Sequence, residues 1–406
     1  MTTRLLLIGY NDGVLAALNG VSPAVEVVVL EERDLWEAKG LAAKAAKHSC
    51  LAEVVFGRYQ QDEQFLDVVA GVSDVDAVAP GLEYAVVAAA QAAEQLGLPG
   101  AGVKAATVLR DKLLLRETTT AAGMPGPAFR EVSSAADIAA FAGSRPCVVK
   151  PAGRQASLGV VLLDAGADVE AAWRECAGAD EGNQLAKRPM HWRYLVEDRL
   201  VGPEFSTECL VSGGEVVFLN VTAKRTAPGP RPVEVGHVVP GDDGDLAPWA
   251  DAVAQLVAAV GFDSGILHAE WVRTESGPVL IECAGRPPGD KIMDLIDLAY
   301  ETNLTEHWLR LLAGVVIAPP AKATGGAAIR FLAGGPGVIE GVEGVDAAGA
   351  RPGVRRVDVL RKAGDRIADL RSSWDRVGSV IAVGDTAEQA EHRAVEAART
   401  VVVRLA

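Results

Sequence analysis

Short apolar runs alternate with stretches of helical periodicity over the first hundred residues. Four such runs end at glycine, proline or acidic residues, at positions 5–8, 25–30, 54–56 and 75–79. Strands that are apolar throughout and separated by helical segments are typical of a parallel sheet covered on both faces. The pattern therefore predicts an N-terminal α/β domain. Its first turn offers Gly9 and Gly13 without the G-x-G-x-x-G motif, which argues against a nicotinamide cofactor.

The middle of the chain contains longer strands and hairpins. One helix is expected from residue 107 to about residue 122, because glycine and then proline follow it. Gly213 and Gly214 predict a β-hairpin, and two further strands, 265–272 and 278–283, flank the turn 275–277. We expect a polar, proline-rich loop over 222–240 and a single helix from residue 292 to about residue 313.

A third texture begins after Pro319 and Pro320, where glycine-rich short strands lead into a final helix from residue 386 to about residue 403. The chain has 406 residues, more than one hydrophobic core usually serves. These changes predict three domains: a Rossmann-like domain over 1–104, a central domain over 105–314 and an α+β domain over 315–406.

The net charge of the chain limits the classes of partner that it can bind. Lysine and arginine number 39 against 54 aspartate and glutamate residues, which gives a net charge of −15. This excess argues against nucleic acid or an anionic membrane as the main partner. The five cysteines are scattered without C-x-x-C spacing, so reduced thiols are expected rather than disulfides or zinc. No apolar run approaches the ~20 residues of a membrane helix, and we expect a cytoplasmic protein.

A lysine and two carboxylates give the first chemical signal. Lys150 ends a predicted strand before a glycine-rich loop, where it would bind phosphate oxygens or be an ordinary surface lysine. Glu270 and Glu282 lie on two strands joined by a short turn, and the alternation of strands can point both into one cleft. Facing carboxylates favour Mg²⁺ or Mn²⁺, with Arg286 as a clamp on phosphate; a solvated charge pair is the alternative.

A second pair of carboxylates lies on a predicted strand and the turn after it. Glu197 and Glu204 are seven residues apart, with Gly202 and Pro203 between them. A strand that leads into a turn can present main-chain groups to the edge of a base, while a later carboxylate accepts hydrogen bonds from ribose hydroxyls. Two solvated carboxylates at a sheet edge would give the same pattern.

Several motifs occur in a fixed order along the chain. They are TVLRDK at 107–112, VKP at 149–151, SLGV at 157–160, Glu197 and Glu204, HAE at 268–270, and IECAGR at 281–286. In this order they resemble the ATP-grasp carboxylate–amine ligases over essentially the whole chain. Within that superfamily the chain is most similar to the L-amino-acid ligases that make dipeptides. Residues 224–226 and 233–240 resemble their substrate loop, and 372–378 resemble part of their C-terminal domain.

The resemblance implies an α/β architecture of the ATP-grasp type. It would comprise an N-terminal Rossmann-like (pre-ATP-grasp) domain, an ATP-grasp domain whose lid covers about 130–200, and a C-terminal ligase-type α+β domain. Residues 157–160 would belong to a mobile loop that closes over the ATP phosphates. The residues implied for ATP are Lys112, Lys150, Ser157, Gly159, Glu197, Leu200 and Glu204.

The resemblance also implies a metal and a substrate site. Glu270 and Glu282 would hold Mg²⁺ or Mn²⁺. Arg286 would stabilise an acyl-phosphate and the tetrahedral intermediate that follows it, and Glu234 and His237 would line the amino-acid pocket, where either could take a proton from the amine. Without the resemblance, the expected role of His237 is that of a buried core histidine. The residues implied for substrates are Glu83, Glu234, His237 and Arg286.

The implied reaction is ATP-dependent formation of an amide or peptide bond, of the EC 6.3 type. A carboxylate, an amino acid or a related acid, would be joined to an amine through an acyl-phosphate, with release of ADP and phosphate. The partners would be these small molecules, and a homodimer is common in such folds. Two alternatives remain: an ATP-grasp carboxylase or one-carbon ligase, and a nucleotide-binding module that does not catalyse.

One residue departs from the family pattern. Members usually carry Asn two residues after the second metal-binding Glu, and this chain has Ala284 there. An Asn carbonyl is a metal ligand, so its loss predicts a weaker or more hydrated magnesium site, or an enzyme less active than its relatives.

Overall fold

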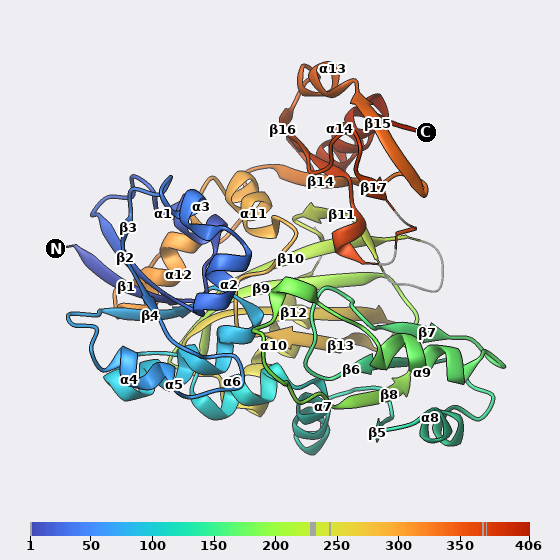
Figure 1. Ribbon diagram of the computed structural model, residues 1–406, viewed down its shortest axis with the longest axis horizontal. Coiled ribbons are helices and arrows are strands. Elements are labelled where there is room, and N and C mark those ends of the chain that lie inside the picture. The colour runs from blue at the N-terminus through green and yellow to red at the C-terminus, as the bar shows by residue number, and fades with distance from the viewer. Residues whose placement is uncertain (1, 228–232, 243–244, 368, 371) are drawn as a thin grey trace.

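A four-stranded parallel sheet forms the N-terminal part of the computed structural model, which describes residues 2–227, 233–242, 245–367, 369–370 and 372–406. The strand order is β3-β2-β1-β4, and helices cover both faces (Figure 1). The apolar run 5–8 is completely buried, as the pattern predicts. The elements are β1 (Thr3–Ile8), α1 (Asp12–Leu18), β2 (Val25–Glu31), α2 (Arg33–Ala38), α3 (Leu41–Ala45), β3 (Leu51–Phe56), α4 (Phe65–Val69), β4 (Ala77–Pro80) and α5 (Val86–Leu96).

The helix predicted from residue 107 is wrong in one respect, because two helices meet there. They are α6 (Val103–Arg110) and α7 (Lys112–Ala121). Asp111 between them has an extended backbone with φ −130°, and its carboxylate accepts from the N–H groups of Leu113 at 2.8 Å and Leu114 at 3.1 Å. Asp111 is therefore an N-cap rather than a helix-interior residue. The break sets Lys112 at the first position of the new helix.

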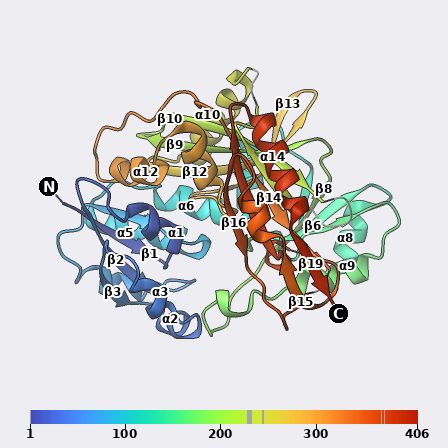
Figure 2. The ribbon, with the colours of Figure 1, turned by 90° about the horizontal axis from the view of Figure 1, so that it is seen from above.

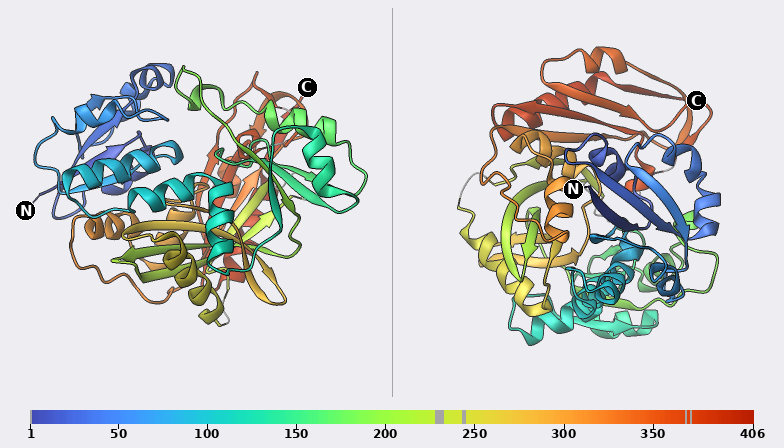
Figure 3. Two further views of the ribbon diagram at one scale, coloured as in Figure 1. Left: turned by 90° about the horizontal axis from the view of Figure 1, so that it is seen from below. Right: turned by 90° about the vertical axis from the view of Figure 1, so that its left-hand side faces the viewer.

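A four-stranded antiparallel sheet lies in the segment predicted to be a lid, about 130–200, and this segment is called the lid below. Its order is β5-β8-β6-β7, and β6 pairs with β8 so that Lys150 lies opposite Leu195. The N-terminal sheet and the lid lie on opposite sides of the molecule (Figure 3). The lid elements are β5 (Phe129–Val132), α8 (Ala135–Ala142), β6 (Cys147–Pro151), β7 (Val161–Leu163), α9 (Val169–Ala177) and β8 (Tyr194–Asp198).

An eight-stranded sheet joins the central and C-terminal parts of the chain, in the order β13-β12-β9-β10-β11-β14-β18-β16. The hairpin expected at Gly213 and Gly214 is confirmed, as is the strand pair around the turn 275–277. The sheet continues without interruption past residue 315, since β11 pairs with β14. The strands are β9 (Glu204–Ser212), β10 (Glu215–Thr226), β11 (Glu234–Val239), β12 (Gly265–Thr274), β13 (Gly277–Ala284), β14 (Gly326–Leu332), β16 (Val354–Val359) and β18 (Gly378–Gly384).

The loop predicted over 222–240 is wrong where the structure describes it; residues 228–232 lie outside the described part. Strand β10 continues to Thr226, and β11 begins at Glu234. Lys224 lies opposite His237 in the antiparallel register of these strands. The polar residues predicted a loop, but two of them pair across neighbouring inner strands of the sheet: Lys224 contacts Glu234 at 3.1 Å.

Two helices replace the single helix predicted over 292–313. They are α11 (Ile292–Tyr300) and α12 (Leu304–Leu312), and helix α10 (Ala247–Val260) precedes them on the large sheet. Glu301 has a left-handed backbone with φ +52°, which ends α11, and Asn303 caps α12 by accepting from the N–H of Glu306 at 3.0 Å. Trp308 of α12 shares a hydrophobic core with Leu5 and Leu7 of β1. These helices therefore hold the N-terminal sheet against the large sheet.

The C-terminal part adds a small sheet and a long helix. Helix α14 covers one face of β14 and β18 (Figure 2). The predicted final helix ends at Thr400 rather than 403, because the β-branched run 401–403 enters a strand that pairs with β15. No helix among the described residues is long and apolar enough to cross a membrane. The elements are β15 (Gly337–Glu343), α13 (Val345–Gly349), β17 (Arg366–Ile367), α14 (Ala387–Thr400) and β19 (Val402–Leu405).

Candidate active site

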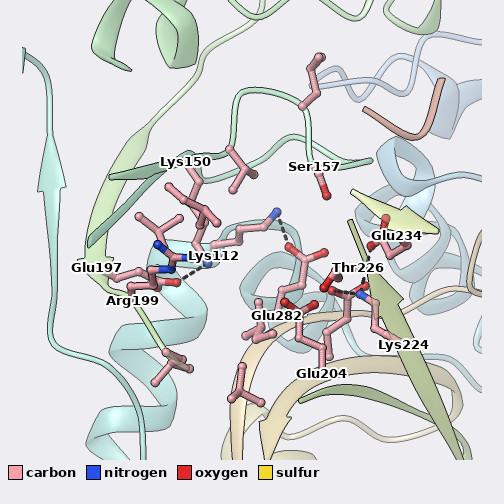
Figure 4. Close-up of a pocket in the computed structure, with 18 of the residues that line it drawn as sticks. Lys112, Lys150, Ser157, Glu197, Arg199, Glu204, Lys224, Thr226, Glu234 and Glu282 are labelled. Carbon is pink, nitrogen blue, oxygen red and sulfur yellow. Dashed lines mark ion pairs between the residues drawn. The ribbon is translucent and has the colours of Figure 1, made fainter. Parts of the chain in front are cut away.

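Two adjoining cavities lie where the N-terminal sheet, the lid and the large sheet meet. The first cavity, of about 320 Å³, opens between the lid and the large sheet (Figure 4). The second cavity, of about 500 Å³, is lined by the N-terminal domain, the large sheet and the C-terminal domain. The two share one wall, so a ligand in one can contact a ligand in the other. The shared residues are Gln155, Ser157, Lys224, Glu234, Glu270 and Glu282.

The second cavity borders the carboxyl edge of the N-terminal sheet. In an open parallel sheet, ligands bind where the connections of adjacent strands run in opposite directions, and here that point lies between β1 and β4. The loops after these strands contribute Asn11, Leu82 and Glu83 to the cavity. A Cβ on Gly81 would lie 2.0 Å from the carbonyl oxygen of Gly9, so only glycine permits the two loops to approach this closely.

Lys150 and Glu197 form a buried ion pair at the inner end of the first cavity. The Lys150 Nζ lies 2.6 Å from Glu197 Oε1, and Arg116 Nε lies 2.9 Å from Glu197 Oε2. Burial alone would raise the pKa of Glu197, but Lys150 and Arg116 outweigh it and lower that pKa to about 2. The carboxylate therefore positions Lys150, a role that was not predicted for Glu197, which was expected only among the residues that bind ATP.

The remaining nucleotide candidates surround the same cavity. Lys112 Nζ lies 3.0 Å from Glu282 Oε2 and donates to the carbonyl of Arg154 at 2.8 Å. Leu200 and Glu204 line the cavity, and burial is the main cause that raises the pKa of Glu204. Apolar side chains from the two sheets and the segments next to their strands supply a wall suited to a planar aromatic base. They are Val148, Val160, Leu162, Leu200 and Ile281.

Ser157 and Gly159 belong to the loop between β6 and β7. Ser157 has a left-handed backbone with φ +56° and lines both cavities. Gly159, with φ +74°, is absent from the described lining of either cavity. A Cβ on Gly159 would lie 2.9 Å from the Cβ of Ala179. Gly159 therefore determines the backbone path of the loop, and Ser157 is the residue of this pair that lines the cavities.

Glu270 and Glu282 face each other across β12 and β13. They are direct partners in the antiparallel register, as strand alternation predicted. Glu270 Oε2 lies 2.7 Å from Lys224 Nζ, so each carboxylate has a lysine beside it. Two hard oxygen donors on facing strands fit Mg²⁺ or Mn²⁺, which keep several waters. No group of three or more potential metal-ligating side chains occurs in the described ranges, and Ala284 supplies no side-chain oxygen.

His268 supports Glu270 from the same strand. Its Nδ1 lies 3.0 Å from Glu208 Oε1 and its Nε2 lies 3.3 Å from Glu270 Oε1. Burial alone would lower the pKa of His268, but the hydrogen bonds to Glu208 and Glu270 raise it to about 9. The carboxylate of Glu208 is completely buried and also accepts from Ser206 and Thr222. This network fixes the orientation of Glu270.

Glu83 and Arg286 lie together in the second cavity. Arg286 Nε lies 2.5 Å from Glu83 Oε2, and Arg110 contacts the other oxygen of Glu83. Burial would raise the pKa of Glu83, but Arg286 and Arg110 lower it to about 2. Two guanidinium groups thus pair with the carboxylate of Glu83, which the resemblance implied for substrate binding. The arrangement fixes the guanidinium of Arg286 in the lining of the second cavity.

Glu234 and His237 are joined by two residues that sequence reasoning missed, Asp290 and Arg376. His237 Nε2 lies 3.1 Å from Asp290 Oδ2, and Arg376 Nη1 donates to Asp290 Oδ1 at 2.6 Å. Arg376 also donates to the carbonyl and the carboxylate of Glu234, at 2.9 and 3.2 Å. No periodicity marks either residue, although Arg376 falls in the stretch 372–378 that resembles the ligase C-terminal domain. The C-terminal domain thereby completes the second cavity.

Comparisons with known proteins match both parts of this site. Residues 143–294 match the ATP-grasp domain, and residues 330–406 match the L-amino acid ligase C-terminal domain 2. An uncharacterized protein, y4rH of Sinorhizobium fredii, is 29% identical over 311 residues, which cover 74% of this chain and 62% of that protein. Alanine–anticapsin ligase of Bacillus subtilis is 26% identical over 267 residues, 60% of this chain and 55% of the ligase. The chain thus spans about three fifths of the length of these relatives.

Solved structures share the fold over the whole chain. The L-amino acid ligase from Bacillus licheniformis superposes with a TM-score of 0.81 at 20% identity, over 100% of this chain and 99% of that one. N5-carboxyaminoimidazole ribonucleotide synthetase from Thermotoga maritima gives 0.69 at 17% identity, over 100% of both chains. The expected ATP-grasp architecture is confirmed. This chain thus contains an ATP-grasp domain, over residues 143–294, and the L-amino acid ligase C-terminal domain 2, over residues 330–406.

Proposed function

We propose that this chain is an ATP-dependent ligase that joins a carboxylate, an amino acid or a related acid, to an amine. The reaction would pass through an acyl-phosphate and release ADP and phosphate. One observation carries the proposal above all: the two cavities share the wall that contains Glu270 and Glu282. Phosphoryl transfer between a nucleotide and a second substrate needs this juxtaposition, because positioning and charge neutralisation supply most of the catalysis.

The first cavity supports nucleotide binding. Its apolar wall offers a surface to the base, Glu204 offers an acceptor to the ribose, and Lys112 and Lys150 offer positive charge to the phosphates. Mg²⁺ held by Glu270 and Glu282 would neutralise charge on the transferred phosphoryl group. The loop that carries Ser157 lines both cavities, a position that suits the exclusion of water from a hydrolysable acyl-phosphate.

The second cavity supports the amide-forming step. Arg286 would stabilise the acyl-phosphate and the oxyanion of the tetrahedral intermediate, and Glu83 orients its guanidinium. Ionised Asp290 can only accept a hydrogen bond, so the Nε2 of His237 carries the hydrogen in this pair. The incoming amine must lose a proton, and Glu234 and His237 are the proposed acceptors on the cavity wall.

A second candidate function is carboxylation of a small molecule with bicarbonate. The fold likeness to N5-carboxyaminoimidazole ribonucleotide synthetase favours it, whereas the L-amino acid ligase C-terminal domain favours amide formation. A nucleotide-binding protein without catalysis is the third candidate, and Ala284 motivates it. The three differ in what releases phosphate from ATP: an amine together with an acid, bicarbonate, or nothing.

Phosphate release from ATP with the twenty amino acids in pairs tests the proposal. We expect release that requires one particular pair, and Glu282→Ala should abolish it. Glu275→Ala is the matched control, since Glu275 is exposed in the turn of the same hairpin. Circular dichroism of each variant should match the wild type. Release that depends on bicarbonate would favour the carboxylase, and ATP binding without release across the panel would favour the third candidate.

A further inference from the structure

Arg154 lines the first cavity without a close carboxylate partner. It lies in the loop between β6 and β7, four residues after Lys150, and Lys112 fixes its backbone by donating to its carbonyl at 2.8 Å. Its side chain is only 7% exposed. A basic side chain buried this deeply usually has a carboxylate or several acceptors beside it, because desolvating a charge is costly.

The other cations of the first cavity do have such partners. Within the part of the chain that the structure describes, each lies within 3.0 Å of a carboxylate oxygen, whereas Arg154 Nη1 is 3.8 Å from its neighbour, Glu181 Oε1. The four pairs are Lys112 with Glu282 at 3.0 Å, Lys150 with Glu197 at 2.6 Å, Arg199 with Asp164 at 2.9 Å and Lys224 with Glu270 at 2.7 Å.

The guanidinium also has unused donors. Nε and Nη1 of Arg154 are buried and have no hydrogen-bond partner among the described residues. The two oxygens of Glu181 accept instead from Tyr84 and, at 3.4 Å, from Gln155. The guanidinium stacks on the ring of Trp192, with 4.4 Å between Cζ and the ring centroid. Stacking holds the side chain in place but satisfies no N–H donor.

We propose that the Arg154 guanidinium is a ligand of the β- and γ-phosphates of the nucleotide, an assignment that rests on the proposed function. A planar guanidinium with free N–H groups matches phosphate oxygens in a bidentate manner, which neither Lys112 nor Lys150 can do. Binding draws Arg154 from Trp192 toward the phosphates. Trp192 in turn contacts Tyr84 edge-on, with ring centroids 6.2 Å apart. A shift of Arg154 would therefore change the surroundings of a tryptophan that packs against the N-terminal domain.

Calorimetric binding of ATP and AMP to the full chain tests this assignment. We expect Arg154→Gln to raise the Kd for ATP roughly tenfold, which corresponds to about 1.4 kcal/mol, while the Kd for AMP stays within about twofold. AMP lacks the two phosphates in question, so the ATP-to-AMP affinity ratio separates phosphate binding from a general structural defect. Arg154→Lys should restore part of the ratio, and Arg174→Gln, an exposed arginine on α9 of the same lid, should leave it unchanged.

Tryptophan fluorescence gives a second readout. Wild-type protein should show a change in fluorescence on addition of ATP that Trp192→Phe largely removes without a change in ATP affinity. An unchanged ATP affinity in Arg154→Gln overturns the assignment, and so does an equal loss of ATP and AMP binding. If the wild type itself binds no ATP, the proposed function fails, a result that the Arg154 variants cannot produce.

Discussion

Glu197 is the carboxylate that balances two buried cations beside the first cavity. Its carboxylate is 5% exposed and pairs with both Lys150 and Arg116. Loss of one partner of such a buried group leaves the others as uncompensated charges, at a cost of about 3–5 kcal/mol. Glu197→Gln should therefore lower the free energy of unfolding by about that amount at neutral pH.

The same carboxylate predicts a pH dependence. The pKa of Glu197 is about 2 in the folded chain and 4.5 when unperturbed, so its ionised form stabilises the fold. This contribution, about 3 kcal/mol, is complete above pH 4.5 and is lost as the pH falls toward about 2. The free energy of unfolding, measured with urea between these pH values, should therefore fall with decreasing pH along a shallower slope for Glu197→Gln than for the wild type. Glu131→Gln, at a half-exposed pair with Arg193, should leave the slope nearly unchanged.

Ala284 predicts a gain of metal affinity on substitution. It lies opposite His268 at the end of β13, two residues after Glu282. Ala284→Asn adds a carbonyl oxygen beside the two carboxylates, so the Mg²⁺ concentration for half-maximal ATP binding should fall roughly three- to tenfold. Ala284→Leu adds similar volume without an oxygen and should give no such decrease. The same Mg²⁺ concentration for half-maximal ATP binding in both variants would contradict the assignment of Glu270 and Glu282 as metal ligands.

At the scale of elements, the loop between β6 and β7 depends on Gly159. An alanine there would have to adopt φ +74° and would place its Cβ 2.9–3.0 Å from Ala179, Cys176 and Pro151. Gly159→Ala should cost about 1–3 kcal/mol of stability and weaken ATP binding, because the lid loop must shift. Gly166 has a similar φ of +79° with nothing within 4 Å of the added carbon. Gly166→Ala should pay only the conformational cost, so the difference between the variants measures the packing.

Element boundaries were the least predictable part of the sequence. Apolar periodicity runs through Asp111 and through Glu301 without a visible break, yet each ends or begins a helix. A cap is decided by a few hydrogen bonds at one residue, whereas periodicity averages over several turns. The strands within 222–240 were not predicted for a different reason. Their charged residues are typical of a loop, and only the folded structure brings Lys224 and Glu234 together as an ion pair.

On the scale of the whole molecule, the eight-stranded sheet joins parts of the chain that the sequence separates. Strand β11 pairs on one side with β10 and on the other with β14, beyond residue 315. A chain that ends at residue 325 would expose the long edge of β11 and lose α14 from its face. We expect it to be insoluble or to lack a cooperative thermal transition.

The full chain supplies the comparison for this truncation. It should unfold the large sheet in one transition, measured by calorimetry. A chain that ends at Thr400 loses β19 and the residues on either side of it; two residues of β19 are exposed and two are half-buried, so this chain should keep that transition at a lower Tm. A soluble, cooperatively folded chain of 325 residues would show instead that the central sheet is stable by itself.

Local sequence patterns were enough to predict the alternating α/β pattern of the N-terminal domain, the order of the motifs, and the facing of Glu270 and Glu282 across a short hairpin. These features depend on residues close along the chain, where side-chain period and turn length fix geometry. Three contacts appear only in the folded chain: Arg376 reaches Asp290, 86 residues away, two arginines pair with Glu83, and Arg154 stays 3.8 Å from the carboxylate of Glu181. Strand order and domain packing set these contacts, and no local pattern encodes which charges will meet.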